Sequence, residues 1–112
     1  MRLICEFASP VEPSELAHLR NEVRALQHVA GDERIVLVID ELFTLALRSG
    51  ATSATTRIFG GPRETSVSIA TDAPVVLAPA VDSVTERLLQ DITFAWGWRR
   101  TAAGTEWWAT IK

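Results

Sequence analysis

The chain has 112 residues, of which 47% are hydrophobic and 22% are charged, and its formal net charge is -3 at pH 7. This composition is typical of a single globular domain and excludes an intrinsically disordered chain. A weakly acidic chain lacks the basic face on which general nucleic-acid binders hold phosphates, so we expect no nucleic-acid partner.

The single cysteine, Cys5, excludes an internal disulfide and a cysteine zinc cage, and it fits a reducing compartment. The N-terminal apolar run is interrupted at Glu6, and no apolar run reaches the roughly 20 residues of a membrane span. We therefore expect a cytoplasmic protein with neither a signal peptide nor a membrane anchor.

A strand and an amphipathic helix are the first two predicted elements. Residues 2–8 alternate as in a strand, and one face consists of Leu3, Cys5 and Phe7. A helix then begins at Pro13–Glu15, where proline and an acid suit the first turn, and Gly31 ends it. Its apolar stripe consists of Leu16, Leu19, Val23 and Leu26.

Residues 33–50 are the most informative stretch, because they predict a helix with a wide apolar face. The apolar positions recur every three to four residues and are Ile35, Val36, Val38, Ile39, Leu42, Phe43, Ala46 and Leu47. Asp32 is the predicted N-cap, and Gly50 stands where a left-handed C-cap is expected. Two carboxylates, Asp40 and Glu41, lie in the middle. Since isolated charges on a buried helix are costly, they must reach water, a partner or a ligand pocket.

Beyond this helix the apolar period changes to two. Residues 55–59 and 65–71 predict an antiparallel hairpin around the turn Gly60–Arg63. A third helix is predicted after Asp82–Ser83, which supplies the N-cap, with Glu86 completing a capping box. The apolar positions of this helix are Val84, Leu88, Leu89, Ile92 and Ala95.

A second hairpin is predicted at the end of the chain, formed by residues 96–100 and 105–111 around Ala103–Gly104. Trp107 and Trp108 are neighbours on a strand and must point to opposite faces of the sheet. At least one of them therefore lies outside the core that holds the other. An outward tryptophan is a candidate self-association contact.

The predicted element order is β-α-α-β-β-α-β-β. Hairpins join most of the strands, and the helices can cover one face of the sheet. This order predicts a two-layer α+β sandwich, in which three helices cover one face of a mixed, mostly antiparallel sheet.

The run from Asp40 to Gly50 resembles the N-box of the GHKL (Bergerat-fold) ATPases, whose helix carries Glu-Leu-x-x-Asn-Ala followed by a basic residue or histidine and then glycine. The likeness is to the bacterial anti-sigma-factor and histidine-kinase-like ATPase domains. The matching residues are Glu41, Leu42, Thr44, Ala46, Arg48 and Gly50.

This resemblance covers most of the chain and implies one Bergerat-like domain over residues 1–112. It places Glu41 at the general-base position and Asp72, at the end of a strand, at the adenine-binding position. Residues 88–108 look like the last helix and hairpin of the family. An active member would be an ATP-dependent serine protein kinase that uses Mg²⁺ and ATP. Its implied partner is a regulatory protein such as a sigma factor or an anti-sigma antagonist.

Two departures from the family pattern weigh against an active member. Leu45 stands where the family places the asparagine that gives an oxygen to Mg²⁺, and leucine has no oxygen to offer this hard cation. Phosphates are bound by glycine-rich backbone, helix N-termini and cations, but the segment between Thr71 and Glu86 contains no Gly, Lys or Arg. We therefore expect no metal site and weak or absent Mg·ATP binding.

Each candidate residue also has a structural interpretation. Glu41 is either a general base or a carboxylate hydrogen-bonded to a neighbour such as Thr44. Asp72 either holds a purine or makes a turn at the strand end. Residues 75–81, at the position of the family's nucleotide lid, are apolar, so they either fill the vacated pocket or form a partner surface.

The sequence thus favours a non-catalytic regulatory or protein-interaction module that derives from an anti-sigma-type ATPase domain. Two alternatives stay open. One is the active ATP-binding kinase, with Glu41 as base and Asp72 reading adenine. The other is a structural homodimer that uses the outer face of the sheet.

Overall fold

The structure, a computed structural model, describes residues 2–26, 33–73 and 81–111. The chain order of its elements is β1 (Arg2–Pro10), α1 (Pro13–Arg24), α2 (Glu33–Arg48), β2 (Ser53–Gly60), β3 (Thr65–Thr71), α3 (Ser83–Ile92), β4 (Thr93–Arg100) and β5 (Thr105–Ile111). The predicted element order is therefore confirmed. The expected N-cap Asp32, the expected helix stop Gly31 and residues 75–80 lie outside the described residues.

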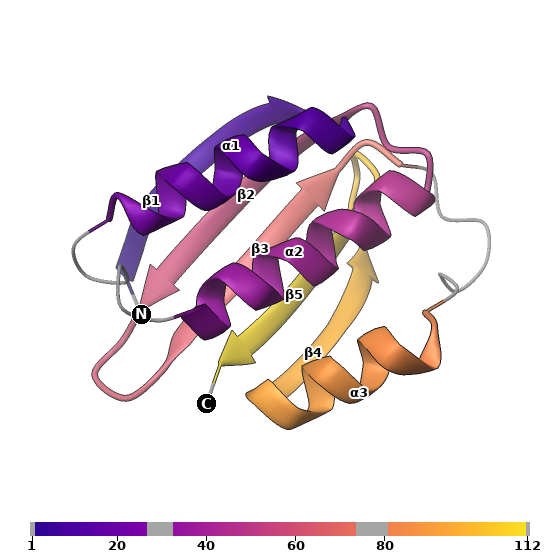
Figure 1. The fold of residues 1–112 in the computed structure, drawn as a ribbon. Coiled ribbons are helices and arrows are strands. Elements are labelled where there is room, and N and C mark those ends of the chain that lie inside the picture. The colour runs from indigo at the N-terminus through magenta and orange to yellow at the C-terminus, as the bar shows by residue number, and fades with distance from the viewer. Residues whose placement is uncertain (1, 27–32, 74–80, 112) are drawn as a thin grey trace.

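The five strands form one open sheet in the order β1-β2-β3-β5-β4. All three helices lie on one face of this sheet, with α2 between α1 and α3 (Figure 1). The predicted two-layer α+β sandwich is confirmed. Every pairing between the described strands is antiparallel, so the sheet is antiparallel rather than mixed.

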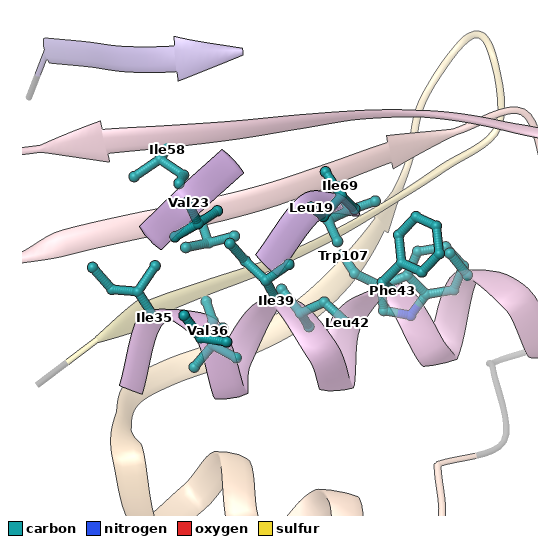
Figure 2. Close-up of a cluster of buried hydrophobic side chains, with 14 of the residues drawn as sticks. Leu19, Val23, Ile35, Val36, Ile39, Leu42, Phe43, Ile58, Ile69 and Trp107 are labelled. Carbon is teal, nitrogen blue, oxygen red and sulfur yellow. The ribbon is translucent and has the colours of Figure 1, made fainter. Parts of the chain in front are cut away.

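The central helix α2 supplies much of the core. It packs against β3 and β5 below it and against α1 and α3 at its sides. Side chains of α2 meet those of α1 and the sheet in one cluster, whose largest members include Phe43 and Trp107 (Figure 2). The buried residues of α2 are Ile35, Val36, Val38, Ile39, Leu42, Phe43, Leu45 and Ala46. Burial of this apolar face stabilises the packing of α2 against the sheet and against the two other helices.

A Schellman motif ends α2, as the glycine at position 50 predicts. Gly50 has a φ of 81°, in the left-handed region that favours glycine. Its N–H donates to the carbonyl of Leu47 at 3.3 Å, and the N–H of Ala51 donates to that of Ala46 at 3.4 Å. The motif satisfies carbonyls at the helix end and turns the chain into β2.

The end of α1 and the register of β1 differ from the prediction. Helix α1 ends at Arg24 rather than near Gly31, and after it the N–H of Leu26 donates to the carbonyl of Val23, a hydrogen bond typical of a tightened last turn. In β1 the register shifts between Leu3 and Cys5. This bulge places Leu3 on the opposite face from Cys5, so the strand does not alternate regularly over its whole length.

The junction of α3 and β4 lies earlier than predicted. The N-cap is Asp82, whose side chain accepts a hydrogen bond from the backbone N–H of Thr85, and the helix ends at Ile92. Strand β4 begins directly at Thr93.

The opposite orientations predicted for the two neighbouring tryptophans are confirmed: Trp107 is fully buried, whereas Trp108 lines a hollow on the other face. Within the part of the chain that is described, no helix is both long and apolar enough to cross a membrane.

Candidate functional site

The two carboxylates in the middle of α2 point to different neighbours. Asp40 faces α1, where the Nε of Arg20 donates to both of its oxygens at 2.7 and 3.0 Å. This partly buried pair raises the pKa of the Arg20 guanidinium, chiefly through the hydrogen bond to Asp40. Asp40 therefore fastens α2 to α1, which removes the cost of an unpaired charge.

Glu41 faces α3 instead. Its Oε2 accepts a hydrogen bond of 2.8 Å from the hydroxyl of Thr85, which is buried with 5% of its surface exposed. The hydroxyl of Thr44, the neighbour considered from the sequence, donates to the backbone carbonyl of Asp40 rather than to Glu41. Glu41 is thus a hydrogen-bond acceptor that joins α2 to the first turn of α3.

Leu45 lies one turn after Glu41 on the same side of α2. It is 2% exposed and belongs to the core cluster. At the position where the family resemblance implies a Mg²⁺ ligand, the helix thus carries a hydrocarbon side chain that is buried from water. Among the described residues, no group of three or more His, Cys, Asp or Glu side chains is arranged to hold a metal ion.

A second connection between α2 and α3 lies at the end of α2. The Nη1 of Arg48 donates to Asp82 Oδ2 at 2.5 Å, and Asp82 Oδ1 accepts the backbone N–H of Thr85 at 2.8 Å. The Thr85 N–H, and then Arg48, lower the pKa of Asp82 to about 2. Because Thr85 contacts both Asp82 and Glu41, these residues form one network, which we call the α2–α3 network (Glu41, Arg48, Asp82 and Thr85).

Asp72 follows the last residue of β3 and turns toward the start of β2. Its Oδ1 accepts the backbone N–H groups of Thr52 at 2.8 Å and Ser53 at 3.1 Å, and its Oδ2 accepts the hydroxyl of Thr52. The hydroxyl of Thr52 is the main reason that the pKa of Asp72 falls to about 2. Asp72 thus closes the open end of the β2–β3 pair, although its side chain remains exposed.

The three residues singled out from the sequence therefore have separate roles in the described structure. Glu41 belongs to the α2–α3 network, Leu45 belongs to the core, and Asp72 fastens a strand end. In the hydrogen bonds described, Asp72 shares no partner with Glu41. The hydrogen bond of Glu41 joins two helices, and those of Asp72 hold the end of β3 to the start of β2.

Sequence reasoning missed Thr85, Thr52 and the pairing of Arg48 with Asp82. The signal for Thr85 was present, because it stands three residues after Asp82, where an N-cap aspartate receives its backbone N–H. The contact of its hydroxyl with Glu41 spans 44 residues of sequence. No local pattern carries that information.

No protein-family model matches this chain, and no curated protein matches it.

Proposed function

We propose that this chain is a non-catalytic regulatory module, which binds a protein partner and derives from an ATPase domain of the anti-sigma-factor type. The element order and the position of the Glu41-bearing helix on the sheet are those expected of a Bergerat-like domain. This support is architectural, and fold alone does not determine function. The proposal therefore depends on the chemistry of α2.

The observation that carries the proposal is the pair of environments around Glu41 and Leu45. The carboxylate of Glu41 accepts the hydroxyl of the buried Thr85, and the next turn of the same helix presents the buried Leu45. A general base must reach its proton, and Mg²⁺ in a kinase site is held by oxygen ligands. Here the carboxylate of Glu41 already has a structural partner, and the side chain of Leu45 has no oxygen.

Asp72 adds a second line of support. Both of its oxygens accept hydrogen bonds from Thr52, and one of them also accepts from Ser53. These contacts explain why an aspartate stands at the strand end, and the explanation needs no bound purine. In the sequence that follows it, the residues up to Glu86 include no glycine, lysine or arginine to hold phosphates.

The active kinase is the competing function. It would require the Glu41–Thr85 hydrogen bond to break. It would also require Mg²⁺ to be coordinated without an oxygen ligand at position 45. It would also require Asp72 to accept a purine amino group in addition to its present donors. No observation in the described structure favours these changes.

Calorimetric titration of the protein with Mg·ATP and Mg·ADP to millimolar concentration tests the proposal. We expect no saturable heat for the natural sequence, because the oxygen ligand and the phosphate-binding backbone are lacking. Saturable binding that is weakened in Asp72→Ala but kept in the surface variant Asp91→Ala would contradict the proposal. It would support the active kinase instead.

The variant Leu45→Asn examines the cause of the expected loss. Restored metal-dependent nucleotide binding in this variant would assign the inactivity to one missing ligand. Leu45 is buried, so Leu45→Met serves as the matched control for changes in packing, and circular dichroism must show that both variants are folded.

A further inference from the structure

The outer face of the sheet, opposite the helices, is uncovered over its whole width among the described residues (Figure 1). In cross-strand register, one row across this face reads Glu6, Arg57, Ser68, Trp108 and Gly97. The next row includes Phe59, Ser66 and Thr110. Two aromatic side chains thus stand on a face that no helix covers.

The outward side chains of the central strand β3 are small: Ser66, Ser68 and Ala70. Larger side chains flank them, with Phe59 on β2 and Trp108 on β5. Between these flanks lies a hollow of about 350 Å³, whose floor includes Ser66 and Ser68. We call this hollow the β3 furrow.

Trp108 forms the ridge beside the furrow, and its neighbour fixes its position. A Cβ at position 97 would come within 3.1 Å of the Trp108 ring, so the ring lies against the backbone of Gly97. Glycine therefore provides the space in which the indole lies on β4. A ring held in this way enters an interface with little loss of conformational entropy.

The charges on this face cancel one another. Arg57 donates to Glu6 at 2.5 Å on one side of the furrow, and Arg99 donates to Glu106 on the other. Two like surfaces that carry balanced charges can meet without net repulsion. This balance favours a copy of the same face over a strongly acidic or basic partner.

We propose that the outer face binds a second copy of this chain in a two-fold symmetric dimer. With the two-fold axis along β3, the rows of the two copies meet in reverse order, so each Trp108 lies opposite the partner's Arg57 and beside the partner's furrow. An indole and a guanidinium attract one another, so each Trp108 contacts a side chain at the edge of the partner's furrow. The contact is isologous, so it closes at two copies.

The size of the face limits the area that the dimer can bury. Five strands about 4.8 Å apart, each seven residues long at about 3.4 Å per residue, give roughly 600 Å². A standard interface buries about 800 Å² on each partner. We therefore expect a reversible dimer that dissociates on dilution. This dimer does not depend on the proposed function, because its test measures mass rather than nucleotide binding.

Sedimentation equilibrium of the natural sequence over a wide concentration range tests the dimer. We expect the mass to rise from that of one copy to that of two as the concentration increases. Trp108→Ala should raise the dissociation constant about tenfold or more, as for a central interface tryptophan. Ser68→Lys leaves Trp108 in place but sets two lysines opposite one another across the two-fold axis, so it should have the same effect. The control is Trp98→Ala, because Trp98 pairs with Trp107 on the helix-covered side and lies at the sheet edge.

A monomer at every concentration would overturn the proposal. The binding partner of the outer face would then be a different protein. A dimer that is equally stable in Trp108→Ala and Ser68→Lys would also overturn it. If one of these variants fails to fold, the mass of the natural sequence and the other variant still decide the question.

Discussion

The hydroxyl of Thr56 is a buried polar group without a hydrogen-bond partner among the described residues. Thr56 is completely buried on the helix side of β2, where its cross-strand neighbours are Phe7 and Ile69. Leaving a buried hydroxyl unpaired costs about 1–3 kcal/mol, whereas valine has nearly the same shape and no polar atom.

Thr56→Val should therefore raise the free energy of unfolding by about 1 kcal/mol in urea denaturation. Thr56→Ser is the matched control, because it keeps the hydroxyl and loses a methyl group, and it should be destabilising. A valine variant less stable than the natural sequence would show that the Thr56 hydroxyl has an acceptor.

The carboxylate of Asp72 makes a prediction about acid stability. Its pKa is about 2 in the folded protein against an ordinary value of 3.8, chiefly because of the Thr52 hydroxyl. A lowered folded-state pKa stabilises the fold fully above the unfolded value, and this contribution is lost as the pH falls from about 3.8 to about 2. In Asp72→Asn the melting temperature should be lower at neutral pH and should fall less steeply in this interval.

Thermal unfolding monitored by circular dichroism at a series of pH values measures this slope. The pKa of Asp82 is also lowered to about 2, so Asp82→Asn should remove a separate part of the same acid dependence. Equal slopes for the natural sequence and Asp72→Asn would mean that the contacts between Asp72 and Thr52 do not persist in solution.

At the scale of single residues, the sequence predicted which side chains needed partners but not what those partners were. Asp40 and Glu41 were recognisable as charges on an apolar helix. Their partners lie 20 and 44 residues away, and only the packing of three helices on one face brings them together. Gly50 was predictable because its conformation is a local property of the helix end.

At the scale of elements, the Glu41–Thr85 hydrogen bond should couple α2 to α3. A double-mutant cycle with Glu41→Ala, Thr85→Ala and the double variant should give a coupling free energy of about 1 kcal/mol in urea unfolding. Glu41→Gln should keep much of the coupling, because its carbonyl oxygen can still accept the hydroxyl hydrogen. Additive effects of the two alanine changes would contradict this contact.

The elements themselves were largely predictable, since their apolar periods are regular. The errors lie at junctions. Helix α3 passes directly into β4 at Thr93, with no turn residue to mark the change, and the apolar pattern of the helix continues to Ala95. The bulge after Leu3 changes the faces of β1 without any glycine or proline as a signal. Register depends on the partner strand, which a single-strand pattern does not contain.

At the scale of the whole molecule, the two-layer sandwich was predictable from the order of hairpins and helices. The uncovered outer face followed from the opposite orientations of Trp107 and Trp108. The furrow along β3 was not predictable, because it requires the register of three strands. The candidate site was predicted as residues but not as an arrangement.

The central claim is that α2 uses its carboxylates to hold the helices together and offers no site for Mg·ATP. Ligand-linked stability tests it most directly, because a ligand that binds the folded state at 100 times its dissociation constant raises the free energy of unfolding by about 2.7 kcal/mol. Urea unfolding of the natural sequence with magnesium alone and with millimolar Mg·ATP should give the same midpoint. A midpoint that rises with ATP concentration, and does so only when magnesium is present, would contradict the claim.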